Sequence, residues 1–141
     1  MLVIDASVAI KWYLDEPLSD AALRLAVAEP DLIAPDLVVA EVGNALWRRR
    51  RQGDISAAQV TAAGSALPHA FSELVAAAEL IGDALRIAEQ LDHPIYDCLY
   101  LALAWRRESV VVTADRRLAA RVHGTGWDLR VRLLAGRAGQ S

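Results

Sequence analysis

The chain has 141 residues, a formal net charge of −3 and 55% apolar residues. One compact domain accommodates this length, and the apolar content excludes a disordered protein. No apolar stretch approaches the ~18 uncharged residues that cross a bilayer, and the opening MLVID has no basic lead, so we expect neither a membrane span nor a signal peptide, and a cytoplasmic location. The one cysteine, Cys98, lies in an apolar run, which excludes an internal disulfide and a thiolate metal cage.

The net charge conceals a gradient along the chain. Residues 1–45 carry a net −6, residues 46–103 a net −2 and residues 104–141 a net +5. The basic C-terminal third permits an anionic partner on one face, whereas the pI of about 5.6 argues against indiscriminate binding of nucleic acid.

Short apolar runs alternate with helical patterns along the whole chain. The apolar runs predict five strands, over residues 2–4, 32–34, 71–75, 109–113 and 129–134. Helical spacing predicts seven helices, over residues 8–13, 21–28, 36–53, 56–67, 76–91, 95–105 and 115–120. This alternation implies an α/β fold with a parallel sheet covered on both faces. We expect a single domain over residues 1–134 and a frayed tail over residues 135–141.

Four carboxylates occupy positions that a globular protein has reason to avoid. Asp5 ends the first strand, Glu41 lies on the inward face of the helix that starts at Asp36, Asp97 lies in the first turn of an apolar helix, and Asp115 follows the VVVT strand. Because ligands of an open parallel sheet bind beyond the carboxyl ends of its strands, Asp5 and Asp115 are expected to meet there. Converging carboxylates repel one another and need a counter-charge, and an all-oxygen set favours Mg²⁺ or Mn²⁺.

Each of these residues also has a simpler interpretation. Asp5 or Asp115 alone is typical of a helix N-cap, and Asp97 alone is typical of a first-turn acid that complements the helix dipole. Ser7 and Thr113 lie two residues from an acid, where a hydroxyl either contacts water or substrate oxygens or caps a turn. One metal site explains all four acids together, so we favour it.

The ordered segments VIDASV, PDLVVAEVGNALWR, HPIYDCLYLALA and VVVTADRRL resemble the four motif regions of PIN-domain ribonucleases. The motif spacing is most similar to VapC-type toxins of bacterial toxin–antitoxin pairs, and the resemblance spans about residues 2–122. It implies a PIN-like three-layer α/β/α fold with a short, mostly parallel sheet. It also places the family's acidic tetrad at the four acids named above, and its supporting polar residues at Ser7, Asn44 and Thr113.

The resemblance further implies Mg²⁺- or Mn²⁺-dependent cleavage of single-stranded RNA. An ion held chiefly by Asp5 and Asp97 would activate water toward the phosphorus, and a second, shared with Glu41 or Asp115, would stabilise the leaving oxygen. No Ser-His-Asp or Cys-His set is evident, because the three histidines, His69, His93 and His123, lie in unrelated segments and are expected to be surface or packing residues.

Two groups of arginines are candidates for RNA binding. Arg116, Arg117 and Arg121 follow Asp115, so we expect them to rim the acidic crevice and hold phosphates. The run from Arg48 to Arg51 is ambiguous, because four consecutive side chains point to different sides of a helix. Its simpler role is to complement the helix C-terminus before Gly53.

The VapC resemblance implies a homodimer and a small cognate antitoxin protein, and an interface would also use some of the four tryptophans. Of two alternatives to a nuclease, the sequence argues against the first and leaves the second open. An Asp-nucleophile phosphatase usually has a second acid two residues after the first and a late lysine, but here that position is Ser7 and the one lysine is Lys11. A Mg²⁺-binding or metal-free regulatory interaction module without catalytic activity is the other alternative.

Overall fold

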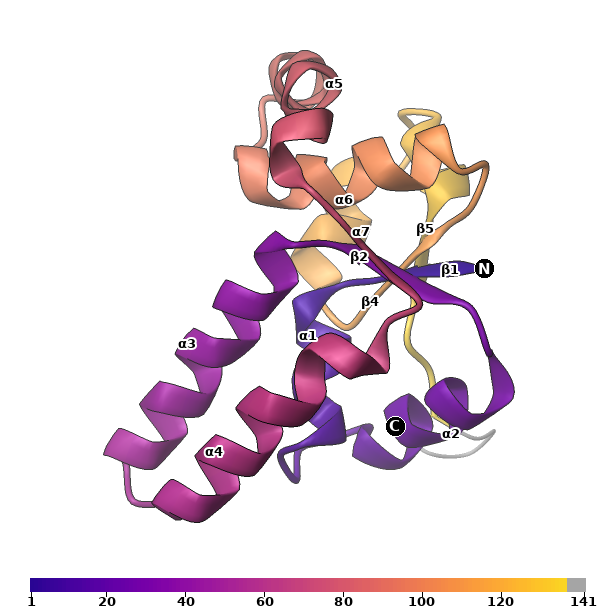
Figure 1. The fold of residues 1–141 in the computed structure, drawn as a ribbon. Coiled ribbons are helices and arrows are strands. Elements are labelled where there is room, and N and C mark those ends of the chain that lie inside the picture. The colour runs from indigo at the N-terminus through magenta and orange to yellow at the C-terminus, as the bar shows by residue number, and fades with distance from the viewer. Residues whose placement is uncertain (137–141) are drawn as a thin grey trace.

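Five short parallel strands form one sheet at the centre of the molecule (Figure 1). The computed structural model describes residues 1–136, so most of the predicted tail, residues 137–141, lies outside the described residues. The sheet order is β3-β2-β1-β4-β5, and all four pairings are parallel. The strands are β1 Leu2–Ile4, β2 Leu32–Pro35, β3 Glu73–Val75, β4 Val111–Thr113 and β5 Val131–Leu133.

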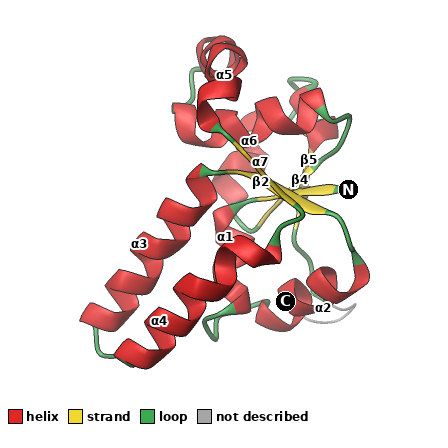
Figure 2. Ribbon diagram, in the orientation of Figure 1, coloured by secondary structure: helices red, strands yellow, loops and turns green. Residues whose placement is uncertain are grey.

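Helices cover both faces of this sheet (Figure 2), which confirms the predicted α/β/α class. The α-helices are α1 Ala6–Ala9, α2 Ser19–Ala28, α3 Leu37–Arg51, α4 Ala57–Ala66, α5 Ala77–Leu91, α6 Ile95–Arg106 and α7 Arg116–Val122. Three short 3-10 helices, which the sequence did not predict, are η1 Ile10–Trp12, η2 Leu67–Ala70 and η3 Trp127–Arg130. In Figure 1, α5 and α6 lie on one side of the sheet, and α1 and α2 lie on the other. No helix of residues 1–136 has both the length and the apolar character to cross a lipid bilayer.

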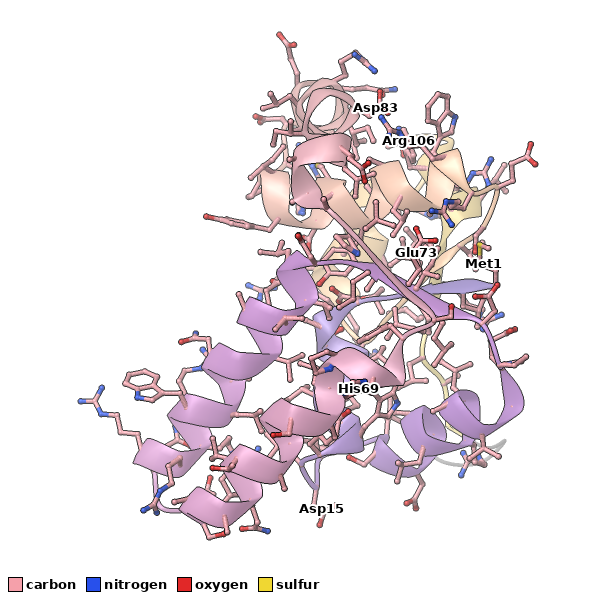
Figure 3. All side chains as sticks on the ribbon, in the orientation of Figure 1. Met1, Asp15, His69, Glu73, Asp83 and Arg106 are labelled. Atoms are coloured by element: carbon pink, nitrogen blue, oxygen red, sulfur yellow. The ribbon has the colours of Figure 1, made fainter. Side chains whose placement is uncertain are left out.

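The helix α6 is buried on nearly all sides, which explains its apolar sequence. Every residue from Cys98 to Ala104 is buried. The helix packs against β1, β2 and β4 on one side and against α5 on the other. At its far end, Arg106 Nε donates to Asp83 Oδ2 of α5 at 2.8 Å, an ion pair visible in Figure 3. The helix is therefore fixed over the sheet, and Asp97 in its first turn is fixed with it.

The strand register brings two of the candidate segments together. Ile4 of β1 pairs with Val112 of β4, and the Asp5 backbone N–H donates to the Val112 carbonyl at 3.0 Å. The residues that follow β1 and the last residue of β4, Thr113, are therefore neighbours, as expected for adjacent parallel strands.

The helices α3 and α4 lie side by side and extend away from the sheet (Figure 1). Gly53, with φ +81°, lies in the turn between them, a conformation that glycine adopts without a Cβ clash. Ser56 caps the start of α4 with a capping box. The Ser56 hydroxyl accepts from the Gln59 backbone N–H, and the Gln59 side chain accepts from the Ser56 backbone N–H. The Asp36 side chain does not cap α3 but accepts from the Ala77 N–H at 3.0 Å, which links the starts of α3 and α5.

The burial of α6 predicts a large difference between two leucine truncations. Leu101 on α6 is fully buried, whereas Leu85 on α5 is 56% exposed. Leu101→Ala should lower the free energy of unfolding by about 2–5 kcal/mol in urea titrations, because it removes buried methyl groups and leaves a cavity. Leu85→Ala is the matched control, with an expected change within about 0.5 kcal/mol. Equal losses in both variants would contradict the packing of α6.

Candidate functional site

Asp5 is the most buried acid of the site, and two hydroxyl groups hold it. The residue is 6% exposed. Its Oδ2 accepts from Ser7 Oγ at 2.5 Å and from Thr113 Oγ1 at 2.7 Å. Ser7 Oγ in turn accepts from the Ala114 N–H at 2.9 Å, and Thr113 Oγ1 accepts from the Asp115 N–H at 3.0 Å. The two hydroxyls therefore fix the carboxylate and join the loop after β1 to the loop after β4.

No cationic side chain neutralises Asp5. Among residues 1–136, no lysine, arginine or histidine lies within ion-pair distance of its carboxylate. Burial raises the pKa of Asp5, and the negative charge of Asp97 raises it further, whereas the hydrogen bonds from Ser7 and Thr113 lower it. Two neutral donors thus hold a carboxylate that the surrounding charge disfavours.

Glu41 projects from α3 into the same region. Its Oε1 accepts from the Tyr100 hydroxyl at 2.7 Å, and Tyr100 is only 1% exposed. Burial raises the pKa of Glu41, the charges of Asp5 and Asp97 raise it further, and the Tyr100 hydrogen bond lowers it. Burial and the charges of Asp5 and Glu41 also raise the pKa of Tyr100, so its hydroxyl keeps the proton that it donates.

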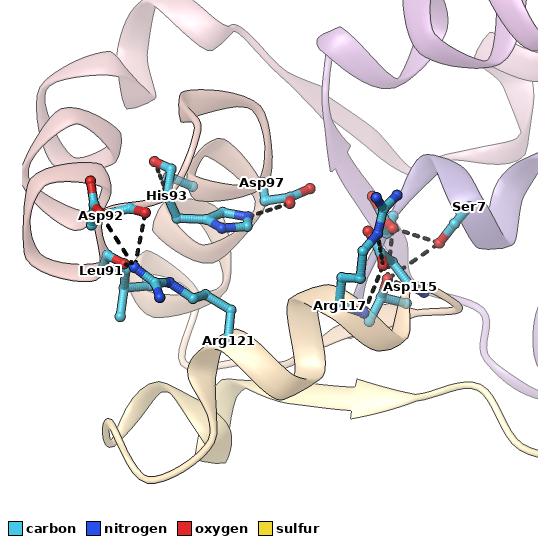
Figure 4. A network of polar contacts seen from close by, with 11 residues as sticks. Ser7, Leu91, Asp92, His93, Asp97, Asp115, Arg117 and Arg121 are labelled. Carbon is cyan, nitrogen blue, oxygen red and sulfur yellow. Dashed lines mark hydrogen bonds and ion pairs between the residues drawn. The ribbon is translucent and has the colours of Figure 1, made fainter.

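Asp97 contacts a histidine that precedes its helix. His93 Nε2 lies 2.6 Å from Asp97 Oδ2, and Figure 4 shows the Asp97 carboxylate pointing from α6 toward the side on which Ser7 and Asp115 lie. The expectation that His93 is an unrelated surface or packing residue is therefore wrong. His69 and His123 are exposed, as expected.

Asp115 is both part of this region and a helix cap. Its Oδ1 accepts from the Arg117 N–H at 2.9 Å at the start of α7, so its simpler interpretation as an N-cap is confirmed. Its own N–H donates to Thr113 Oγ1, the hydroxyl that also donates to Asp5, so Asp115 lies close to Asp5. Figure 4 shows Asp115 near Ser7. Asn44 is exposed on α3, one turn beyond Glu41.

The structure therefore brings Asp5, Glu41 and Asp97 within electrostatic influence of one another and links Asp115 to them through Thr113. In the described part of the chain, no three acidic, histidine or cysteine side chains converge tightly enough to hold one ion directly. The donor set still fits Mg²⁺ or Mn²⁺, because Mg²⁺ commonly binds through one or two carboxylates and keeps several waters. Asp5 is also buried and lacks a cationic partner within residues 1–136, which a divalent cation would supply.

The three arginines after Asp115 differ in where they reach. Arg121 donates to the carbonyls of Leu91 and Asp92, the latter at 2.9 Å, and so closes the C-terminal end of α5 (Figure 4). The Arg117 side chain is 95% exposed, with Nε 3.7 Å from Asp115 Oδ1. Arg116 is exposed as well. The Arg117 side chain thus lies beside Asp115, whereas Arg121 reaches the end of α5 at Leu91 and Asp92.

Tyr100 and His93 are the two contributors that sequence reasoning missed. Tyr100 lies three residues after Asp97, and His93 lies four residues before it. The Tyr100 spacing places its side chain on the same side of α6 as Asp97, which is a signal that the sequence offers. His93 precedes α6, so no helical spacing predicts its contact with Asp97.

Comparison with known proteins points to one family. The PIN domain family matches residues 2–123. Ribonuclease VapC3 of Pyrobaculum aerophilum is 32% identical over 120 residues, covering 84% of this chain and 92% of the relative. Ribonuclease VapC1 of Mycobacterium tuberculosis is 34% identical over 120 residues, covering 84% of this chain and 88% of the relative.

Two solved structures share the fold. The crystal structure of PAE2754 from Pyrobaculum aerophilum matches with a TM-score of 0.69 at 24% identity, over 87% of this chain and 80% of that one. FitAcB from Neisseria gonorrhoeae matches with a TM-score of 0.62 at 14% identity, over 96% of this chain and 97% of that one. At these sequence identities the structural similarity supports a shared fold, and it carries no conclusion about function.

The raised pKa of Asp5 predicts how the metal-free protein responds to pH. An acid whose pKa is higher in the folded state loses stabilisation as pH rises from its unfolded-state pKa through its folded-state pKa. Asp5→Asn removes this loss, so at pH 7 in EDTA the variant should unfold at higher urea concentration than the wild type. The difference should shrink below about pH 4, where Asp5 is protonated in both states.

The control for this experiment is Asp15→Asn, because Asp15 is exposed on the surface (Figure 3). This variant should retain the wild-type pH dependence. An Asp5→Asn protein less stable than the wild type at pH 7 would show that the Asp5 charge is favourable in the fold.

The Tyr100 hydrogen bond predicts a second stability effect. Tyr100→Phe leaves Glu41 without its buried donor and should lower the free energy of unfolding by about 1–3 kcal/mol at pH 7 in urea titrations. The loss should be smaller at pH 4, because a hydrogen bond to a protonated carboxyl is weaker than one to a carboxylate. Tyr96→Phe, at a position 59% exposed on the same helix, is the control and should be nearly neutral. Equal effects at both positions would contradict the role of Tyr100.

Proposed function

Because this chain belongs to the PIN-domain family and is similar to ribonucleases VapC over most of its length, we propose that it is a divalent-metal-dependent endoribonuclease that cleaves single-stranded regions of RNA. The observation that carries the proposal is the environment of the Asp5 carboxylate. A buried carboxylate, held by hydroxyls and facing two further acids, has no cationic side chain beside it in residues 1–136. Such a group is suited to hold a metal cation rather than to stabilise the fold.

Asp5 and Asp97 would hold Mg²⁺ or Mn²⁺, with Glu41 and Asp115 completing the acidic set. When bound, the cation lowers the pKa of a water molecule and offsets the charge of the phosphate. This chain's own contribution is to orient the donors. Ser7 and Thr113 orient Asp5 and His93 contacts Asp97.

Tyr100 completes this support by orienting Glu41. Outer partners of this kind commonly set metal affinity and activity. Asn44, exposed on α3 next to Glu41, is a supporting polar residue that faces solvent, where substrate arrives.

The same proposal extends to the partners. The protein acts as the toxin of a VapBC-type pair, forms a homodimer and is inhibited by a small cognate antitoxin. Trp47 and Trp105 support a protein interface, because each is 53% exposed and large aromatic side chains are common at interfaces. Arg116, Arg117 and Arg121 are proposed to contact RNA, and the exposure of Arg116 and Arg117 supports this more than the carbonyl-bonded position of Arg121 does.

The activity is tested with a labelled, unstructured RNA and purified protein in Mn²⁺. The wild type should cleave internally and stop in EDTA. Asp97→Asn should lower the cleavage rate at least about 100-fold, since even outer-shell partners of a metal site commonly contribute about 10–100-fold. Asp15→Asn is the matched control at an exposed acid and should be fully active.

Cleavage by Asp97→Asn at the wild-type rate, or wild-type cleavage that persists in EDTA, would reject the metal-dependent nuclease. Absence of any RNA cleavage by the wild type, with retained binding of Mn²⁺, would favour a regulatory metal-binding module instead.

A further inference from the structure

A groove opens beside the carboxylates, between the segment α1–η1 and helix α3. Its volume is about 380 Å³. Ser7 and Glu41 of the candidate site line it, so the groove is continuous with the acids. Its other polar walls are Lys11, Glu16 and Arg48. Basic side chains are thus placed next to an acidic site that would otherwise repel a polyanion.

Arg48 reaches this groove because of its position on α3. Glu41, Ala45 and Arg48 recur at helical spacing, so they share one face of the helix, and all three line the groove. Seven residues of α-helix advance about 10 Å, which places Arg48 well beyond Glu41 along the groove. Arg48 is exposed, and in the part of the chain that the structure describes it takes part in no ion pair.

The other three arginines of this run have different surroundings. Arg49 pairs with Glu16 at 3.2 Å and with Asp54 at 3.0 Å. Arg50 donates to the Ile55 carbonyl at 3.4 Å, and the Arg51 guanidinium lies over the Trp47 ring, 5.5 Å from its centroid. The four side chains diverge, as the helical geometry predicts, and Arg48 is the member that faces the groove.

Lys11 also lines the groove, from η1 on the side opposite α3. Its Nζ lies 3.3 Å from Glu16 Oε1, and its side chain is 10% exposed. Because Glu16 is shared between Lys11 and Arg49, one carboxylate serves two cations. The charges of Lys11 and Glu16 offset each other in this pair, so Arg48 is the groove cation that has no carboxylate partner within residues 1–136.

We infer that this groove binds the phosphodiester backbone of the RNA strand next to the bond that is cleaved, with Arg48 contacting one phosphate. This inference rests on the proposed function. A guanidinium group pairs with phosphate through two parallel hydrogen bonds, and an arginine without a carboxylate partner retains its full capacity to do so. This stretch of the strand then runs along α3, and any contact with Arg116 or Arg117 on α7 involves another part of the RNA.

The test compares Arg48→Gln with Arg50→Gln, two exposed arginines of one helix that point to nearly opposite sides. In Mn²⁺, Arg48→Gln should raise the KM for a single-stranded RNA about 10-fold, as expected for loss of a charged hydrogen bond, and change kcat less than twofold. In EDTA, fluorescence anisotropy with a labelled single-stranded RNA should show a log–log salt slope shallower by about 0.7, the value for one lost phosphate contact. Arg50→Gln should match the wild type in both measurements.

Three outcomes overturn the inference. Arg48→Gln could behave as Arg50→Gln, it could lower kcat with KM unchanged, or Arg117→Gln on α7 could show the KM and slope changes in its place. If any of these occurs while the wild type cleaves RNA in Mn²⁺, the nuclease stands and the groove assignment fails. If the wild type cleaves no RNA, the proposed function fails, and an unchanged salt slope for Arg48→Gln would still reject the groove on its own. Matching thermal melting curves confirm that the variants are folded.

Discussion

Burial of the acids Asp5 and Glu41 close to the charge of Asp97 is the constraint on which the site depends. The parallel register of β1 and β4 fixes Asp5 beside Thr113, and the buried helix α6 carries Asp97 toward the same edge of the sheet. Burial is the main cause of the raised pKa values of Asp5 and Glu41, the charge of Asp97 raises both further, and the charge of Asp5 adds to the effect at Glu41. Because the fold holds these carboxylates in an unfavourable electrostatic environment, binding a divalent cation between them would stabilise the arrangement.

The groups that hold the acids are mostly neutral donors, and this choice has a chemical consequence. Ser7, Thr113 and Tyr100 each donate one hydrogen bond without adding a positive charge. A lysine or arginine in these positions would form an ion pair with the carboxylate and compete with a metal. Positive charge without a carboxylate partner in residues 1–136 is found farther out, at Arg48, where it can act on a phosphate backbone without neutralising Asp5 or Glu41.

Much of this arrangement is encoded in local patterns. The five strands and seven α-helices follow from apolar runs and helical spacing, with ends displaced by a few residues. The 3-10 helices are not predicted, because a segment of three or four residues is too short to show a periodic pattern. The four acids could be selected because they follow strands or interrupt apolar faces. The hydrogen bond from Tyr100 to Glu41 could not be predicted, because it joins two residues of different helices that are 59 positions apart in the chain. Arg48 was likewise ambiguous until the groove beside α3 was known.

The most direct test of the central claim is the anomalous scattering of Mn²⁺ in crystals of the protein soaked near neutral pH. We expect a manganese peak in contact with the carboxylates of Asp5 and Asp97, with water completing the coordination and with Glu41 or Asp115 nearby. A saturating soak that leaves these carboxylates without manganese, or places it only at acids elsewhere on the surface, would contradict the claim that their repulsion is resolved by a divalent cation.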